Sequence, residues 1–299
     1  MTQLHGIIPP TTTPFTQDGE IDLDAARAQV RWMIGQGVHG LATGGSTGEG
    51  HTLDPDEFRR LIAVTTEEAA GRVPVVAGII VDSTRDAIRR GKAVADLGVA
   101  ALQVTPVHYL FRPDDAAMAA HFRAITEATG LPVIIYNVVP WSYLSPALLV
   151  RIMADNPGVI GVKQSAGDLK LVADLMATAA PGNLIFSAVD ALLYPSFALG
   201  AHGAIAAILS AAPRACVDLW DAVAAGDHAH ALLLHTKLLA LWNAMVGDNL
   251  PACTKFAQSL QGCPAGAPRA PMPPATAARQ AAIRAALAGL APAQARAAE

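Results

Sequence analysis

The sequence predicts a (β/α)8 barrel, also called a TIM barrel, followed by an appended C-terminal helical segment. Short apolar runs alternate with helical stretches at near-regular spacing, and eight such units can be counted. The apolar runs are continuous rather than alternating, as expected for strands that are covered on both faces. An open doubly wound sheet is the competing fold, but its dinucleotide-binding glycine fingerprint is missing after the first strand.

The predicted strands are five to nine residues long and are bounded by turn residues such as Gly, Pro, Asn and Asp. They are expected at residues 6–10, 38–42, 73–80, 100–105, 131–139, 159–165, 184–188 and 202–208. The helices between them have apolar residues at helical spacing, and Pro55 opens one of them at a favoured first position. These helices are expected at residues 22–36, 55–70, 84–97, 113–129, 145–154, 168–178 and 191–199.

After Pro213 the pattern is helical, with further helices at 214–225, 227–246, 251–260 and 276–288. Gly289 is expected to end the last helix, and residues 262–274 form a loop rich in Pro, Gly and Ala. Only the first of these helices is needed to complete a barrel. We therefore predict a barrel domain at 1–225 that contains the catalytic site and a C-terminal helical segment at 226–299.

The composition indicates a soluble cytoplasmic protein. Apolar residues make up 52% of the chain and charged residues 15%, which implies a sizeable core. The net charge is −4 and no basic patch suggests a nucleic-acid partner. Cys216, Cys253 and Cys263 are far apart and suit buried positions in a reducing compartment. The N-terminus carries no secretion pattern, and no apolar run reaches the roughly 20 residues that cross a membrane.

Lys163 is the first candidate for chemistry, because it lies at the end of an apolar strand. The other four lysines lie in predicted helices, where we expect solvated amines. An ammonium buried without a partner is costly, so such a lysine tends to lose its proton, and a neutral amine attacks carbonyl groups. The alternative is a lysine that extends out of the strand end to meet a carboxylate.

Other strand ends carry further candidates, since the active site of a barrel lies at the carboxyl ends of its strands. The glycine-rich stretch 44–49 could bind a carboxylate through backbone N–H groups and through the hydroxyls of Ser46 and Thr47, or it could be a turn that is glycine-rich for steric reasons only. Tyr136 could shuttle protons, although a buried tyrosine that only finds a partner is more common. His108 or Tyr109 could reach the same mouth.

Two further kinds of site are disfavoured. His228, His230 and His235 form the only local histidine cluster, and they lie in the C-terminal helices rather than at strand ends, so we expect no metal. Glu49 and Asp82 lie near strand ends and could be a catalytic pair of acids. Acids at such positions more commonly cap helices or make loop contacts, so we expect a structural role for both.

Taken together, these residues resemble the dihydrodipicolinate synthase / N-acetylneuraminate lyase family of pyruvate-dependent class I aldolases. The motifs that carry the resemblance are Gly45-Ser46-Thr47-Gly48-Glu49, Tyr136-Asn137 and Gly161-Val162-Lys163. Weaker matches at 13–15, 105–106 and 200–205 extend it over nearly the whole chain, in the right order.

The resemblance implies that Lys163 forms an imine with pyruvate or another 2-keto acid and that Tyr136 shuttles protons. It implies that Gly45, Ser46 and Thr47 bind the carboxylate, with a hydroxyl of this loop relaying the proton of Tyr136. It also implies that the backbone carbonyl of Ile205 contributes to the pocket. No metal or organic cofactor is implied. Members of the family are usually homotetramers whose active sites lend each other a tyrosine, a role for which Tyr109 or His108 is the candidate here.

The sequence departs from the true synthases where they bind their second substrate. Their tyrosine motif continues to an arginine that grips a carboxylate, whereas residues 138–143 here are Val-Val-Pro-Trp-Ser-Tyr. We therefore expect an aldehyde partner other than aspartate semialdehyde, and Trp141 and Tyr143 could shape a pocket for an apolar, aromatic or sugar-acid tail. The alternatives are a 4-hydroxy-tetrahydrodipicolinate synthase proper, a 2-keto-3-deoxy sugar acid dehydratase, and a regulatory protein that binds keto acids without turnover.

Overall fold

Eight parallel strands are hydrogen-bonded in the order β1-β8-β7-β6-β5-β4-β3-β2 in the computed structural model, which describes residues 4–290. The strands are β1 (Gly6–Ile7), β2 (Leu41–Thr43), β3 (Val75–Ile79), β4 (Ala101–Val104), β5 (Val133–Asn137), β6 (Val159–Gln164), β7 (Leu184–Ser187) and β8 (Gly203–Ala204). Backbone hydrogen bonds from His39 N to Ile7 O (2.8 Å) and from Ala42 N to Pro9 O (3.0 Å) join the β1 segment to the β2 segment and close the ring. The predicted (β/α)8 barrel is confirmed.

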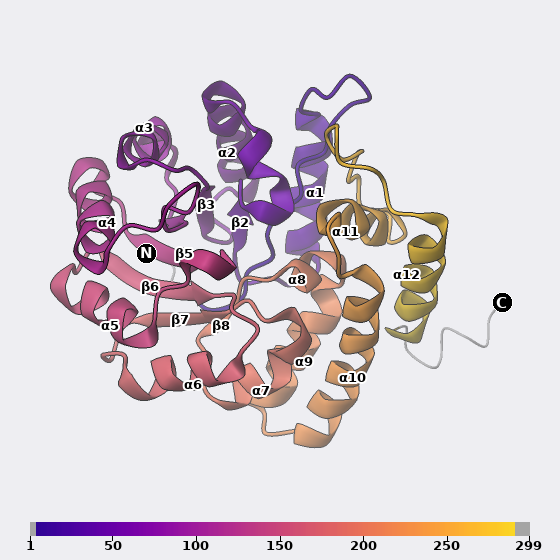
Figure 1. Ribbon diagram of the computed structural model, residues 1–299. Helices are drawn as coiled ribbons and strands as arrows, with labels where there is room; N and C mark the ends of the chain where they lie inside the picture. Colours follow the sequence, from indigo (N-terminus) through magenta and orange to yellow (C-terminus); the bar gives the residue numbers. More distant parts are fainter. Residues whose placement is uncertain (1–3, 291–299) are drawn as a thin grey trace.

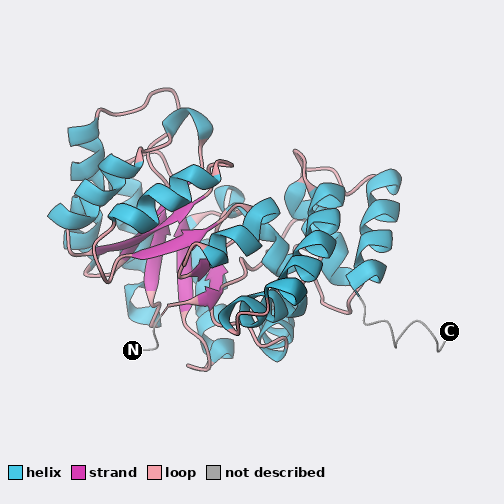
Figure 2. Cartoon of the chain, turned by 90° about the horizontal axis from the view of Figure 1, so that it is seen from below, coloured by secondary structure: helices cyan, strands magenta, loops and turns pink. Residues whose placement is uncertain are grey.

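Helices cover the outside of this ring (Figures 1 and 2). They are α1 (Leu23–Gly35), α2 (Pro55–Ala69), α3 (Thr84–Val94), α4 (Asp115–Thr129), α5 (Pro146–Asp155), α6 (Leu169–Thr178), α7 (Leu193–Ala198), α8 (Ala207–Ala211) and α9 (Pro213–Ala224). Their starts follow local sequence signals. At α2, for example, the Asp54 side chain accepts from the backbone N–H of Glu57, and the Glu57 side chain accepts from that of Asp54.

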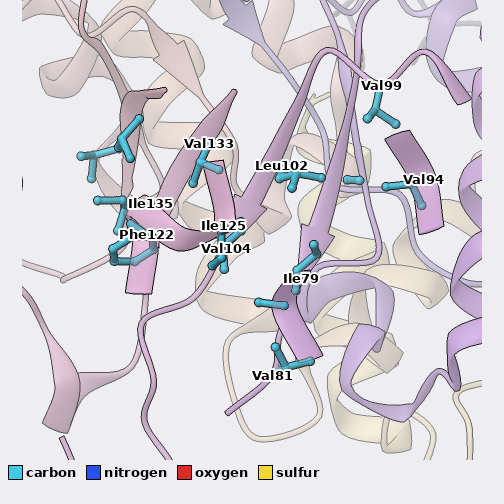
Figure 3. Packing of buried hydrophobic residues seen from close by; sticks show 14 of the residues in the cluster. Ile79, Val81, Val94, Val99, Leu102, Val104, Phe122, Ile125, Val133 and Ile135 are labelled. Carbon is cyan, nitrogen blue, oxygen red and sulfur yellow. The ribbon is translucent and has the colours of Figure 1, made fainter. Parts of the chain in front are cut away.

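Apolar side chains fill both faces of the strands. Inside the barrel they form one small cluster: Leu4, Ile8, Ala42, Val76, Ala101, Ile134, Phe186 and Ile205. Outside it, alternate residues such as Leu102 and Val104 of β4 point to the helices, where they meet Phe122 and Ile125 of α4 (Figure 3). Burial on both faces is the reason that the strands read as continuous apolar runs.

Several element ends differ from the prediction by a few residues, and two predicted ends in the C-terminal half are wrong in kind. The last strand ends at Ala204, and Ile208 belongs to helix α8. The Asp190 side chain accepts from Ile208 N (2.8 Å) and so satisfies, from outside the helix, a backbone N–H at its buried start. Gly289 does not end the last helix, α12 (Ala277–Leu290). It is absent from the glycines with positive φ, the conformation in which glycine ends helices.

The C-terminal segment contains α10 (His228–Met245), α11 (Leu250–Ser259) and α12, which lie at one flank of the barrel (Figure 1). Helix α10 packs on α9 and α12, and α11 packs on α8. The predicted domain boundary falls between α9 and α10, and the outer ends of the two predicted ranges, 1–3 and 291–299, lie outside the described residues. Within residues 4–290, no helix is long and apolar enough to cross a membrane. Cys216, Cys253 and Cys263 are buried and free, as the sequence predicts.

His121 on α4 provides a test of this packing through pH. Its side chain is 4% exposed, its Nδ1 lies 2.9 Å from Thr84 Oγ1, and burial lowers its pKa to about 4 from 6.5. The unfolded chain therefore takes up a proton near pH 6.5, while the folded protein resists it until about pH 4. We expect this residue to remove about 3 kcal/mol of stability as the pH falls through that window.

The measurement is urea unfolding of the wild type and of His121→Gln between pH 7.5 and 4. The variant should lose less stability over this range, although His39 and His202, whose pKa values burial also lowers, keep part of the slope. Parallel pH profiles for the two proteins would contradict the assignment.

Candidate active site

A cavity of about 460 Å³ opens at the carboxyl ends of the strands. Its polar lining comes from four different strand ends and consists of Ser46, Thr47, Tyr136, Lys163, Ser165 and Asp190. Ile205, which follows β8, also lines it. The structure thus brings together five of the residues that the sequence singles out: Lys163, Tyr136, Ser46, Thr47 and Ile205.

Lys163 lies in this cavity lining, on β6. The parallel register pairs it with Tyr136 of β5, and its Nζ lies 3.6 Å from the centroid of the tyrosine ring. The side chain is 4% exposed, and none of the ion pairs within residues 4–290 involves it. A lysine that extends outward to a surface carboxylate does not have this geometry. An amine held against an aromatic face and open to a cavity is instead placed to meet a ligand.

Tyr136 connects the lysine to the glycine-rich loop. Its hydroxyl donates a hydrogen bond to Ser46 Oγ (3.2 Å), and its side chain is 5% exposed. The hydroxyl that contacts the tyrosine is therefore that of Ser46, whereas Thr47 lines the cavity without such a bond. A chain from Tyr136 through Ser46 is available for moving a proton.

The glycine-rich loop is fixed by its close contacts. Ser46–Gly48 form a single 3-10 turn, and Thr13 Oγ1 donates to Gly48 O (2.6 Å). A Cβ atom on Gly50 would lie 1.8 Å from Gly44 O, so only glycine fits there. Gly45 precedes the turn and accepts from the backbone N–H groups of Gly48 and Gly50, but it is not part of the cavity lining. Glycine is therefore required in this loop for steric reasons. The tight turn that the glycines allow also places Ser46 and Thr47 in the cavity lining.

Asp190 and Ser165 line the cavity although the sequence did not single them out. Burial raises the pKa of Asp190 to about 6, while hydrogen bonds from Ile208 N and Ala207 N and the charge of Lys163 oppose that rise. Ser165 Oγ is buried and has no hydrogen-bond partner within residues 4–290. An unpaired buried hydroxyl beside the lysine is available to a bound ligand.

His108 and Tyr109 lie outside the cavity lining of their own chain. Their backbone N–H groups donate to Asp82 Oδ1 (3.2 and 2.9 Å), and the Tyr109 side chain is 67% exposed. Their assignment as substrate-binding residues stays a prediction. Asp82 makes the loop contacts expected of it.

Trp141 and Tyr143 are also absent from the cavity lining. The Trp141 indole donates to His108 O (2.8 Å) and remains 70% exposed. Ser142 Oγ donates to Val107 O (2.9 Å). These two bonds join the loops that follow β4 and β5, and the first holds the Trp141 side chain away from the cavity. Within this chain, Val138 is the residue of that segment that lines the site.

Glu49 has a structural partner that the sequence did not reveal. Its carboxylate, 0% exposed, accepts from Lys255 Nζ (2.6 Å) and from Arg269 N (2.8 Å). The expectation of a solvated Lys255 is wrong, because this side chain of α11 is 2% exposed. The buried pair joins the loop of Ser46 and Thr47 to the C-terminal segment, which also contributes Trp242, Leu250 and Pro251 to the cavity.

The histidines of the C-terminal helices do not assemble a metal site within residues 4–290. His228 Nδ1 lies 3.3 Å from the Tyr194 hydroxyl, and no group of three potential ligands occurs in that part of the chain.

Comparison with known proteins agrees with this geometry. The model of the dihydrodipicolinate synthetase family matches residues 3–290. The chain belongs to this family. The prediction of the family is confirmed, and with it the prediction of a Schiff-base-forming lyase of the class I aldolase type.

One relative of this chain is the 4-hydroxy-tetrahydrodipicolinate synthase of Acidiphilium cryptum, which is 36% identical over 289 residues. The match covers 96% of this chain and 98% of the relative. That of Phenylobacterium zucineum is 38% identical over 286 residues, covering 95% and 96%. Among solved structures, YagE from Escherichia coli K12, a member of the same family in complex with pyruvate, has a TM-score of 0.91 and 28% identity, covering 96% and 98%. The Bacillus anthracis synthase DapA-2 has a TM-score of 0.92 and 26% identity, covering 98% and 100%.

Proposed function

We propose that Lys163 Nζ forms an imine with the keto carbon of pyruvate or another 2-keto acid, and that the protein uses this imine to make or break a carbon–carbon bond. The observation that carries the proposal is the environment of Lys163, which is buried, faces a cavity, forms no ion pair within residues 4–290 and touches the ring of Tyr136. The pyruvate complex of the structural neighbour YagE supports it.

In this scheme the other cavity residues orient the acid and move protons. Ser46 and Thr47, with the backbone of the turn that begins at Gly45, hold the substrate carboxylate. Tyr136 takes a proton from the methyl group of the bound keto acid and exchanges it through Ser46 Oγ. The carbonyl of Ile205 completes the pocket beside them. The protonated imine accepts the electron pair, so the reaction draws on no metal or organic cofactor.

A second candidate is 4-hydroxy-tetrahydrodipicolinate synthesis itself, because relatives at 36–38% identity carry that name. The same lysine and tyrosine serve both candidates. They differ in the aldehyde, and the synthase reaction uses aspartate semialdehyde, which brings a second carboxylate. The site holds no arginine for it within the residues that line the cavity. We therefore favour an aldolase or lyase with another partner.

For assembly and location we propose a homotetramer in the cytoplasm. Four exposed apolar side chains cluster on the loops after β4 and β5 and suit a protein interface: Tyr109, Leu110, Phe111 and Trp141. Such an interface would also give Tyr109 or His108 a route to a neighbouring cavity. One structural neighbour, 27% identical, is described as a monomeric synthase variant, so light scattering of the purified protein is the direct test.

Borohydride trapping tests the proposed chemistry. The protein is incubated with pyruvate, reduced with sodium borohydride, and read by intact mass and by peptide mapping. We expect one pyruvate-derived group on the peptide that carries Lys163, because reduction fixes an imine as a stable amine. Lys163→Ala should gain none. An unmodified wild type, or an adduct spread over the exposed lysines such as Lys170, would overturn the proposal.

A further inference from the structure

The lining of the cavity beyond the reactive groups is apolar. Val138, Leu192, Trp242, Leu250 and Pro251 contribute side chains without charge. They come from the strand-end loops and from the C-terminal helices. The second substrate must enter the same cavity as the keto acid, so these side chains surround it.

Charge within this cavity is limited to two groups. Lys163 is committed to the imine in the proposed function, and Asp190 is a carboxyl group that repels a second anion. Two arginines of the C-terminal segment are engaged elsewhere, since Arg269 bonds to Glu57 and to Gly19 O, and Arg279 bonds to Met245 O and Val246 O. A carboxylate on the aldehyde would be desolvated here without a cationic partner, which is costly.

The loop after β5 cannot easily supply that partner. Trp141 and Ser142 are fixed to the backbone of residues 107 and 108, outside the cavity, and Val138 presents an isopropyl group to it. A polyhydroxylated aldehyde would find one free hydroxyl in this lining, that of Ser165, and one carboxyl group, that of Asp190, which already accepts from Ile208 N. Two such groups are too few for a chain of several hydroxyls.

We propose that the carbonyl partner of the keto acid is an uncharged, apolar aldehyde, and that the product or cleavage substrate is a 4-hydroxy-2-keto acid with an apolar tail. This inference rests on the proposed function. The enamine carbon derived from the pyruvate methyl group forms a bond to the aldehyde carbon, and the aldehyde oxygen takes up a proton. Water then hydrolyses the imine, releasing the hydroxy-keto acid and the free amine of Lys163. Cleavage is the reverse.

A pair of aldehydes matched in length provides the test. Butanal and succinate semialdehyde have four carbons each and differ in one terminal carboxylate, and D-glyceraldehyde serves as the polyhydroxylated comparison. With pyruvate, we expect kcat/KM for butanal to exceed that for each of the other two by at least about tenfold, the scale of discrimination that an apolar pocket supplies. Equal values, or a preference for succinate semialdehyde or glyceraldehyde, would overturn the proposal.

Val138→Arg sharpens the test by adding a cation to the cavity lining. It should shift the ratio toward succinate semialdehyde by about tenfold or more, because a guanidinium pairs with a carboxylate. Leu232→Arg adds the same charge at an exposed position of α10, outside the lining, and should leave the ratio unchanged. A similar shift in both variants would contradict the assignment.

Borohydride trapping with pyruvate on the same samples distinguishes a failure of the apolar-aldehyde proposal from a failure of the proposed imine chemistry. An adduct on Lys163 combined with no turnover of butanal overturns the apolar-aldehyde proposal alone. The absence of any adduct overturns the proposed function as well.

Discussion

Replacement of Lys163 by alanine should lower the rate at which the protein exchanges the methyl protons of pyruvate by about 10⁴-fold or more, the scale on which loss of a catalytic nucleophile acts. Exchange in deuterium oxide, followed by proton NMR, reports enamine formation and needs no knowledge of the aldehyde. The variant should fold normally, because Lys163 takes part in none of the ion pairs within residues 4–290.

Tyr136→Phe is the matched control for this experiment. It keeps the ring that the amine contacts and removes the hydroxyl that donates to Ser46. It should still be trapped by borohydride, while exchange falls by about 10² to 10⁴-fold, the usual contribution of a positioned acid or base. Exchange by Lys163→Ala within tenfold of the wild type would refute the imine mechanism.

Lys255→Met should destabilise the protein by about 3–5 kcal/mol, because it leaves the buried carboxylate of Glu49 without its cation. The readout is the midpoint of urea unfolding at constant slope.

Lys170→Met controls for the chemical change itself. Lys170 forms an ion pair with Asp174 (2.6 Å), but its side chain is 73% exposed, so the midpoint should hardly move. Adding Glu49→Gln to Lys255→Met should recover part of the loss, because the unpaired buried charge is then removed. Equal effects of the two lysine replacements would show that the buried pair contributes no more than a surface pair.

The sequence predicted the elements that depend on local patterns. Apolar runs located the strands to within a few residues, and its position at a strand end made Lys163 the candidate nucleophile. Strand ends converge in a barrel by topology, so Tyr136 and the glycine-rich loop could be placed beside that lysine.

Contacts between segments that are distant in the chain could not be predicted from the sequence. Asp190 caps α8 from another loop, so the start of that helix carries no local signal. The apolar pattern therefore predicts a strand that continues to Ile208. Lys255 lies in a helix that looks solvated, and its carboxylate partner is far away in the chain. Ser165 carries no distinguishing signal in the sequence, and only the fold places it in the cavity lining. Periodicity reports which face of an element is buried, but not which element covers it.

The pairing of Glu49 with Lys255 has a consequence for how the protein matures during synthesis. The partners are 206 positions apart, so the loop of Ser46 and Thr47 leaves the ribosome long before the helix that anchors it. Until that helix arrives, Glu49 stays hydrated and the cavity lacks the wall formed by Trp242, Leu250 and Pro251. Long-range contacts of this kind form late, because a large loop must close first. A nascent chain therefore carries Lys163 without a finished pocket around it until α10 and α11 have docked.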